Sequence, residues 1–297
     1  MTREPLRKRN EWDENQKRDL VMPPAPEPLP IAVADSHCHL DIEDGDGFLA
    51  PEAAVSEANA VGVDRIVQVG VDVPSSIWSA EAANRLPRVL AAVAIHPNEA
   101  PVIAQRDGKS GLDAAIAEID RLAKLPRVRA VGETGLDFFR TAETGIADQE
   151  YSFRSHIEIA KTNNIAVMIH DRDAHSDVVR VLLDTKPEKV IFHCFSGDGE
   201  LARIAAEHGW YCSFAGNVTF KNAANLREGL TALPNELILV ETDAPFLTPI
   251  PYRGRPNASY LIPHTVRFMA DVRGMSLETM CQHLSDNTNQ IFGNFDD

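Results

Sequence analysis

The sequence predicts an α/β protein built as a single TIM-type (β/α)8 barrel. Two observations support this fold class. Eight short β-rich runs alternate with stretches of helical periodicity from residue 33 onward, and a chain of 297 residues suits one large core of this kind. No Gly-x-Gly-x-x-Gly pattern follows the first run, so a dinucleotide-binding, doubly wound sheet explains the sequence less well.

The β-rich runs have the length and composition of buried strands, and the stretches between them place apolar residues at helical spacing. The expected strands cover residues 33–37, 64–70, 89–95, 128–133, 165–170, 189–193, 210–214 and 237–242. The expected helices cover residues 51–62, 75–85, 112–124, 147–163, 174–185, 199–208, 220–232 and 259–272, and a further helix near 276–291 closes the chain.

Residues 1–30 differ from the rest of the chain. They mix basic and acidic residues without an apolar stripe, and they end in the proline-rich run from Pro23 to Pro30. We expect this extension to be disordered or draped on the surface, with a partner-binding arm as the less favoured interpretation. Residues 31–297 are expected to form the barrel domain.

The net charge of −15 argues against broad, sequence-blind adhesion to nucleic acid, which needs a basic face. It is compatible with a phosphate-bearing substrate, because bound metal ions supply positive charge locally. No apolar run is long enough to cross a membrane, and the N-terminus lacks a secretory pattern. The cysteines form no Cys-x-x-Cys pair and are expected to be reduced thiols, so we expect a cytoplasmic protein without membrane contact. A monomer is the default expectation for the oligomeric state, which the sequence does not specify.

The first expected strand ends in His37 and His39. Because alternate side chains of a strand share a face, the two imidazoles point the same way, which suits a divalent metal. Two core histidines bonded to the backbone explain this pair equally well when it is considered alone. Partners on later strands therefore decide between the two interpretations.

Those partners follow at the carboxyl ends of later strands, where barrel active sites lie. They are His96 after the third strand, Glu133 after the fourth, His170 after the fifth, His193 after the sixth and Asp243 after the eighth. This distribution favours a metal centre at the carboxyl face of the barrel.

The number of ligands suggests two divalent cations per chain. His37, His39, Glu133 and Asp243 are expected to hold one, and Glu133, His170 and His193 the other, with Glu133 bridging. Zn, Mn, Co and Mg all fit mixed imidazole and carboxylate ligands. Two close metals generate a hydroxide nucleophile and clamp a phosphoryl oxygen, which is the logic of phosphodiester hydrolysis.

Two residues of the set have a second expected role. Asp243 is interpreted as both ligand and general base, in preference to a purely structural ligand. His96 is expected to donate a hydrogen bond to a substrate phosphate or to the leaving oxygen, and orienting another ligand explains it almost as well. Asp35 is expected to support a ligand and not to act in catalysis.

A phosphate substrate also needs cationic groups at the same rim. Basic residues that follow expected strands include Arg140, Arg172, Lys221, Arg253 and Arg255. Arg172, Arg253 and Arg255 are the candidates for binding phosphate, and Tyr252 is the candidate for stacking on a base.

Six motifs, in order and suitably spaced between about residues 33 and 293, resemble those of TatD-type metal-dependent deoxyribonucleases. They are Asp35-Ser-His-Cys-His-Leu40, Ile95-His-Pro97, Gly132-Glu-Thr-Gly-Leu-Asp137, His170-Asp-Arg-Asp-Ala174, His193-Cys-Phe-Ser-Gly197 and Glu241-Thr-Asp-Ala-Pro245. The run Gln149, Phe153 and His156 also fits the pattern.

The resemblance implies a metallohydrolase barrel of the amidohydrolase-like group that hydrolyses DNA, often from 3′ ends. It implies metal ligands at His37, His39, Glu133, His170, His193 and Asp243. This chain departs from the family at Arg253-Gly-Arg-Pro-Asn257, which Ala258 and Ser259 follow in place of polar residues, and in its extension of 30 residues. The first departure bears on substrate preference and leaves the metal centre intact.

The leading hypothesis is therefore a two-metal phosphodiesterase acting on DNA ends, 3′ to 5′. The alternative is hydrolysis of a carboxylic ester or amide, such as an aminoacyl ester on tRNA or a cyclic amide. Glu133 stands where related amide-cleaving barrels often carry a modified lysine, which favours the phosphodiesterase. A metal-binding module for partner assembly fits less well, because binding alone does not require Asp243 and the arginines of the rim.

Overall fold

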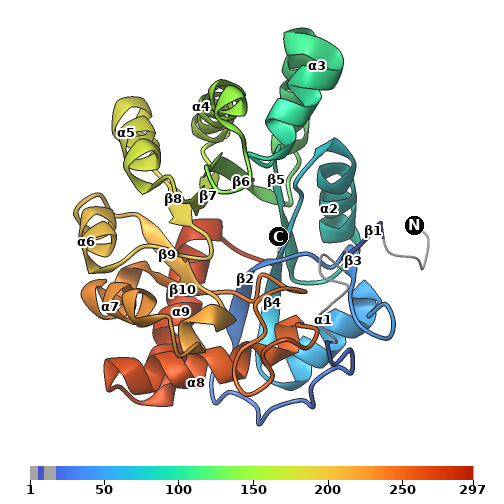
Figure 1. Cartoon of the computed structure of the whole chain (residues 1–297). Helices are drawn as coiled ribbons and strands as arrows, with labels where there is room; N and C mark the ends of the chain where they lie inside the picture. The colour runs from blue at the N-terminus through green and yellow to red at the C-terminus, as the bar shows by residue number, and fades with distance from the viewer. Residues whose placement is uncertain (1–5, 10–17, 297) are drawn as a thin grey trace.

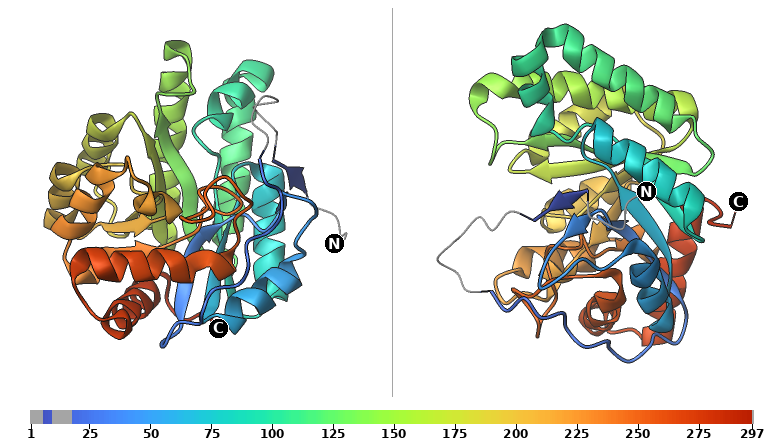
Figure 2. Two further views of the ribbon diagram at one scale, coloured as in Figure 1. Left: turned by 60° about the horizontal axis from the view of Figure 1, so that its bottom comes forward. Right: turned by 90° about the vertical axis from the view of Figure 1, so that its right-hand side faces the viewer.

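The computed structural model describes residues 6–9 and 18–296. Eight parallel strands form one sheet that curves almost into a closed barrel, and the helices pack around its outside (Figures 1 and 2). The predicted fold class is confirmed. The order of the strands around the sheet follows the chain, as expected for successive βα units. They are β2 (Val33–Cys38), β4 (Val63–Val69), β5 (Val89–Val93), β6 (Val128–Asp137), β7 (Ala166–Arg172), β8 (Val190–Phe192), β9 (Tyr211–Phe214) and β10 (Ile238–Val240).

The barrel closes beyond the end of β10. The segment that follows this strand runs beside β2, and Cys38 forms a parallel bridge with Ala244. The amide of Asp243 donates to the carbonyl of His37 (2.9 Å), and the amide of His39 donates to the carbonyl of Ala244 (2.8 Å). These bonds hold the carboxyl end of β2 against the segment that carries Asp243.

The helices match the expected ones to within a few residues, with one exception. They are α1 (Pro51–Ala60), α2 (Val73–Arg85), α3 (Glu99–Ala123), α4 (Ile146–Asn163), α5 (His175–Thr185), α6 (Gly199–Glu207), α7 (Ala224–Ala232), α8 (Ile262–Arg273) and α9 (Leu277–Phe292). Helix α3 begins well before the expected residue 112. Gly108 interrupts it with φ of 70°, and because this break disrupts the periodicity, the sequence pattern indicated only the second part.

The strands are buried on both faces, which explains their continuous apolar runs. One apolar cluster fills the inside of the barrel and includes Val67, Leu90 and Met168. A larger cluster lies between the strands and the surrounding helices. The four cysteines, Cys38, Cys194, Cys212 and Cys281, are free thiols.

The described parts of the N-terminal extension lie on the barrel. Strand β1 (Arg7–Lys8) pairs with β3 (Ile42–Glu43), which follows the first barrel strand. Residues 18–30 run along α8 and α1 (Figure 1). The hydroxyl of Tyr260 donates to the carbonyl of Pro23 (2.6 Å), and the amide of Leu29 donates to the carbonyl of Val61 (3.0 Å). Disorder was also expected for residues 1–5 and 10–17, which lie outside the described residues, so that expectation stays a prediction. No helix within residues 6–9 and 18–296 has the length and apolar character to span a membrane.

Two buried polar side chains of helix α4 accept hydrogen bonds from backbone amides at the ends of two strands. Gln149 accepts from the amide of Asp137 (3.1 Å), and Nε2 of His156 accepts from the amide of Ile95 (3.0 Å). His156 Nδ1 is bonded to the carbonyl of Ser152 (2.7 Å), which fixes a neutral ring with the proton on Nδ1. Gln149 and His156 thereby fix the carboxyl ends of β6 and β5 at the face of the barrel that carries the predicted ligands.

We expect acid to destabilise the fold through His156. Burial lowers the pKa of His156 from 6.5 to about 4. Below pH 6.5 the unfolded chain binds a proton that the folded chain does not, so stability falls as the pH drops from 6.5 towards 4, by roughly 3 kcal/mol from this group. Urea denaturation of EDTA-treated protein at pH 7 and pH 4.5 measures this loss. His156→Gln is expected to be less stable at pH 7 and to lose less on acidification, and an equal loss in both proteins would contradict the assignment.

Candidate metal centre

The site forms where the carboxyl ends of the strands meet. Glu133 lies on β6, which continues beyond the predicted residue 133 to Asp137 and pairs again with β7. Glycines on either side of Glu133 allow this close pairing. A Cβ on Gly135 would collide with the carbonyl oxygen of His170, and one on Gly132 would collide with the side chain of Met168. The backbone of β6 can therefore press against β7 and carry Glu133 into the centre of the pocket.

One oxygen of Glu133 faces the first histidine pair. Oε1 lies 3.8 Å from Nε2 of His37 and 3.5 Å from Nε2 of His39. Oδ1 of Asp243 lies 3.7 Å and 3.6 Å from the same two nitrogens. The sequence separates His37 from Asp243 by 206 positions, and the fold brings the polar atoms of all four residues together.

The other oxygen of Glu133 faces a second group of imidazoles. Oε2 lies 2.9 Å from Nε2 of His193 and 3.1 Å from Nδ1 of His170. Nε2 of His96 is 3.6 Å away on the same side. Glu133 therefore stands between two clusters of nitrogen atoms and presents one oxygen to each.

The donor set fits divalent metal. Nδ1 of His39 donates to the carbonyl of Val69 (2.9 Å), and Nδ1 of His37 faces the sulfur of Met168 (3.1 Å). Both Nε2 atoms are then lone-pair acceptors, yet they lie 3.3 Å apart and face carboxylate oxygens. Acceptors that converge in this way without a proton between them match the arrangement that a cation holds together. At His193, Nδ1 faces Glu241 (3.3 Å) and Nε2 points at Glu133 (2.9 Å). Burial opposes a charge on this ring, but the two carboxylates raise the pKa of His193 well above its ordinary value.

The electrostatics of the pocket favour the ligand forms of His37 and Glu133. Burial and the charge of His193 lower the pKa of His37 well below its ordinary value, so this ring is neutral. Burial alone would raise the pKa of Glu133, but the neighbouring imidazoles, His193 foremost, hold it well below its ordinary value. The buried Glu133 is therefore ionised.

All six residues predicted as ligands thus converge, and two acids to which the sequence assigned no role, Glu241 and Asp137, lie beside them. Glu241 accepts from the amide of Cys194 (2.8 Å) and faces Nδ1 of His193, which orients that ring. Oδ2 of Asp137 lies 3.3 Å from Nε2 of His170. Both acids lie within the quoted motifs, a few residues from the predicted ligands Glu133 and Asp243, and that proximity in the sequence was the signal. Asp35 accepts from the amide and hydroxyl of Thr242 (2.9 and 2.5 Å), which ties β2 to the segment that carries Asp243.

The pocket that most of the predicted metal ligands line has a volume of about 480 Å³, and several arginines also line it. Arg172 lines it, as does His96, while Arg140 and Arg9 add further cations. The guanidinium of Arg172 lies 4.0 Å from the centre of the Phe139 ring, whose residue is 64% exposed. Arg172, which lines the pocket, thus packs over the ring of a largely exposed phenylalanine.

The other predicted substrate residues do not line this pocket. Tyr252, Arg253 and Arg255 surround a separate hollow together with Arg18 and Asp19. Arg255 is paired with Asp19, and Arg253 packs over the ring of Phe220 at 4.2 Å. Residues 252–255 are held away from the metal pocket because Asn257, just after them, donates to the carbonyls of Thr242 and Phe246 (3.1 and 2.5 Å). The predicted substrate role of these three residues stays a prediction.

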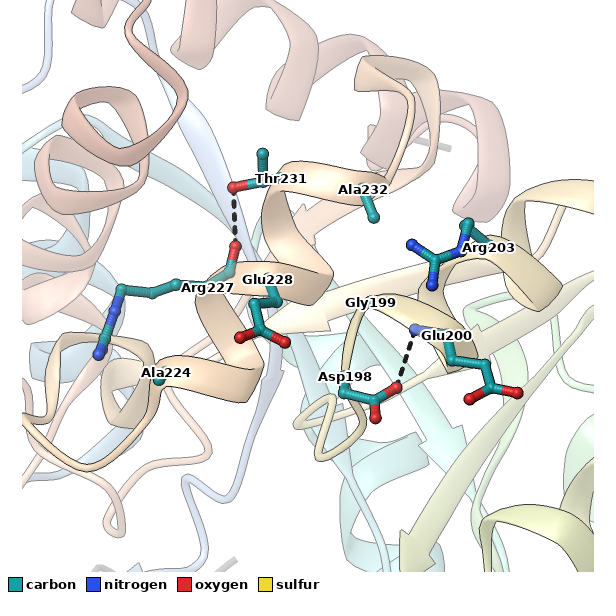
Figure 3. A pocket seen from close by; sticks show the side chains of 9 residues that line it. All are labelled: Asp198, Gly199, Glu200, Arg203, Ala224, Arg227, Glu228, Thr231 and Ala232. Atoms are coloured by element: carbon teal, nitrogen blue, oxygen red, sulfur yellow. Dashed lines mark hydrogen bonds between the residues drawn. The ribbon is translucent and has the colours of Figure 1, made fainter.

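A larger hollow of about 670 Å³ lies between α6 and α7 (Figure 3). Its acidic residues Asp198 and Glu228 are accompanied by the basic Arg203 and Arg227. Asp198 caps α6 by accepting from the amide of Glu200 (2.9 Å), and Arg227 donates to the carbonyl of Phe220 (2.8 Å). Asp198 and Arg227 thus serve the ends of the two helices, and no histidine is among the residues that line the hollow, so the chemistry is expected at the histidine cluster.

The barrel and its converging histidines and carboxylates place the chain among the metal-dependent barrel hydrolases. A family model described as TatD related DNase matches residues 34–293. The chain belongs to this TatD family, as its motifs indicated. It is 41% identical over 244 residues to a protein of Mycobacterium tuberculosis named uncharacterized metal-dependent hydrolase TatD, covering 80% of this chain and 89% of that one.

Further relatives agree with this placement. The chain is 35% identical over 243 residues to the uncharacterized metal-dependent hydrolase YabD of Bacillus subtilis, covering 81% of this chain and 92% of that protein. The crystal structure of YJJV, a TatD homologue from Escherichia coli, superposes with a TM-score of 0.77 at 23% identity, covering 88% of this chain and 98% of that one. This last likeness bears on the fold alone.

Proposed function

We propose that this hydrolase uses two divalent metals to cleave phosphodiester bonds of DNA, working 3′ to 5′ from single-stranded or frayed ends. The observation that carries the proposal is the carboxylate of Glu133, which offers Oε1 to His37 and His39 and Oε2 to His170 and His193. A carboxylate between two imidazole clusters is the arrangement of a bridged two-metal site. The description of the matching family model supports DNA as the substrate.

Each cation has a distinct set of proposed ligands. His37, His39, Asp243 and Oε1 of Glu133 would hold one, and His170, His193 and Oε2 of Glu133 the other. When bound, two such cations make water acidic enough to attack and neutralise charge on the phosphoryl oxygens. Zn, Mn, Co and Mg remain open as the native metal.

Asp243 is the proposed proton acceptor. Its side chain lines the pocket and is 16% exposed, so it can meet a water molecule that approaches the phosphorus. The attacking water forms the new O–P bond and gives its proton to this carboxylate, while the bond from phosphorus to the 3′ oxygen of the preceding nucleotide breaks. The leaving 3′ oxygen then takes up a proton from solvent water, and Asp243 later returns its proton to solvent.

His96 is the proposed hydrogen-bond donor to the substrate. The amide of Asn98 donates to Nδ1 of His96 (3.0 Å), so the ring proton lies on Nε2, which faces the pocket. Burial lowers the pKa of His96 to about 3, so the ring is neutral at working pH. A neutral Nε2–H can donate to a phosphate or leaving oxygen without acting as an acid.

The rim supports an anionic substrate with a base attached. Arg140 and Arg172 line the same pocket as the metal ligands, although the chain as a whole carries a net charge of −15. Carboxylates also line the pocket, so these arginines would draw a phosphate to it together with the bound metal cations, while the acidic remainder of the surface repels it. The exposed ring of Phe139 beside Arg172 offers a surface on which a terminal base can stack.

A matrix of metals against substrates tests the proposal. EDTA-stripped protein is supplied with Mg, Mn, Co or Zn and given single-stranded DNA with a label at either end, RNA, a carboxylic ester and a cyclic amide. We expect DNA cleavage only with added metal, with loss of nucleotides from the 3′ end. Intact DNA with every metal, together with cleavage of the ester or amide, would replace the phosphodiesterase by the alternative function.

A further inference from the structure

The N-terminal extension places a cation at the mouth of the metal pocket. Arg9 belongs to the part of the chain that precedes the matched family region of residues 34–293. Its side chain nevertheless lines the pocket together with His39, Asp243 and Phe246. Nη1 donates to the carbonyl of Pro245 (3.0 Å), and the guanidinium carbon lies 4.8 Å from the centre of the Phe246 ring. Arg9 therefore rests on the loop that carries the proposed proton acceptor.

The backbone of the extension fixes this position. The amide of Arg9 donates to the carbonyl of Glu43 (2.9 Å), as part of the pairing of β1 with β3. Arg7, two residues earlier, forms an ion pair with the fully buried Asp41 (2.6 Å). Because alternate residues of a strand face opposite sides, Arg7 and Arg9 turn towards the barrel and Lys8 turns away, with its side chain 75% exposed.

Arg9 shares its carboxylate partner with a second arginine. Oδ2 of Asp44 accepts from Nη1 of Arg9 (2.9 Å), but both oxygens of Asp44 also accept from Arg18 (2.9 and 2.8 Å). Two guanidinium groups thus share one carboxylate. Nη1 makes both of the hydrogen bonds that Arg9's side chain forms with described residues, which leaves Nε and Nη2 for a ligand.

We propose that Arg9 binds a phosphate of the substrate at the mouth of the metal pocket, as a binding residue contributed by the extension. This deepens the proposed function, because it takes the phosphate of that substrate as the ligand. A guanidinium presents paired donors that match two phosphate oxygens. Arg9 lies on the Phe246 side of the pocket, so it would hold a phosphate next to the proton acceptor Asp243.

Kinetics and direct binding, measured on the full metal-loaded chain, test this role. Arg9→Ala is compared with Arg9→Lys and with Lys8→Ala, which removes the same charge from the neighbouring, outward-facing position. Three quantities are measured: KM and kcat on a single-stranded oligonucleotide, the Kd of inorganic phosphate by calorimetry, and bound metal per chain. Thermal melting controls for folding.

Loss of one charge-assisted pair predicts about a tenfold rise in KM and in the phosphate Kd for Arg9→Ala, with kcat within about twofold and metal content unchanged. The KM and phosphate Kd of Arg9→Lys should lie between those of Arg9→Ala and the wild type, because a lysine keeps the charge but not the paired donors of a guanidinium. Lys8→Ala should match the wild type. Equal effects of Arg9→Ala and Lys8→Ala would overturn the proposal in favour of long-range charge alone. A fall in KM after Arg9→Ala would overturn it in favour of an arm that excludes substrate.

Phosphate binding separates this inference from the proposed function. If the wild type cleaves no phosphodiester but binds phosphate, and Arg9→Ala weakens that binding tenfold, Arg9 keeps its role and DNA hydrolysis is rejected. If DNA is cleaved while phosphate binding and KM are the same in wild type and Arg9→Ala, the phosphodiesterase stands and Arg9 is only a structural contact. Absence of phosphate binding by the metal-loaded wild type would overturn the role of Arg9.

Discussion

Replacing Glu133 by alanine is expected to abolish hydrolysis, with kcat reduced by at least about a thousandfold. This single side chain presents Oε1 within 3.8 Å of His37 and His39 and Oε2 within 3.1 Å of His170 and His193. Its loss removes a ligand from both proposed metals at once. Metal ions contribute several kcal/mol of transition-state stabilisation, and each 1.36 kcal/mol is a factor of about ten in rate.

Bound metal, measured by elemental analysis after dialysis, distinguishes this cause from misfolding. We expect about two equivalents in the wild type and one or none in Glu133→Ala, with an unchanged far-UV spectrum. Glu133→Gln keeps the shape but offers one carbonyl oxygen in place of two, so it should also lose metal. Glu158→Ala, an exposed surface acid paired with Lys161, is the control and should behave like the wild type. Two retained metals and near-normal activity in Glu133→Ala would refute the bridging role.

Asp243→Asn is expected to slow the chemical step by about a hundredfold to ten-thousandfold while most of the metal stays bound. An amide oxygen can still face the cation, but the amide group cannot accept the proton of the attacking water. Asparagine is the appropriate substitution here because Asp243 has φ of +53°, a backbone conformation that asparagine tolerates and alanine does not.

Measuring both kcat and bound metal in Asp243→Asn decides the role of Asp243. A large fall in kcat with metal retained identifies a proton acceptor. A fall in kcat that parallels loss of metal identifies a structural ligand, which is the other interpretation of this residue. Unchanged kcat in Asp243→Asn would exclude both, and the proton would then have to leave by another group of the pocket.

The barrel was predictable because its signal is local. Most strands are short apolar runs bounded by polar residues, and each helix has its own periodicity, so residues 89–95 or 147–163 reveal their structure without reference to the rest. The ligands were predictable for a related reason. In a parallel barrel every strand ends at the same face, so residues that follow strands must converge, whatever their separation in the chain.

Other features depend on contacts that no local pattern encodes. Strand β1 forms only because residues 7–8 meet residues 42–43, and a two-residue strand with basic side chains has no apolar pattern of its own. Tyr252, Arg253 and Arg255 follow the last strand, as an active-site loop should, yet Asn257 ties that loop back and the three side chains face another hollow.

The sequence by itself determined the order of strands and helices, the face of the barrel that carries the chemistry and the side chains that converge there, because these follow from periodicity and from the geometry of a parallel sheet. Only the tertiary structure decided how the two oxygens of Glu133 are divided between the imidazole clusters and which arginines reach the rim of the metal pocket. Those outcomes depend on distances of a few ångströms between segments far apart in the chain. Arg9 and Arg172 lie at the pocket, and Arg253 does not, for that reason.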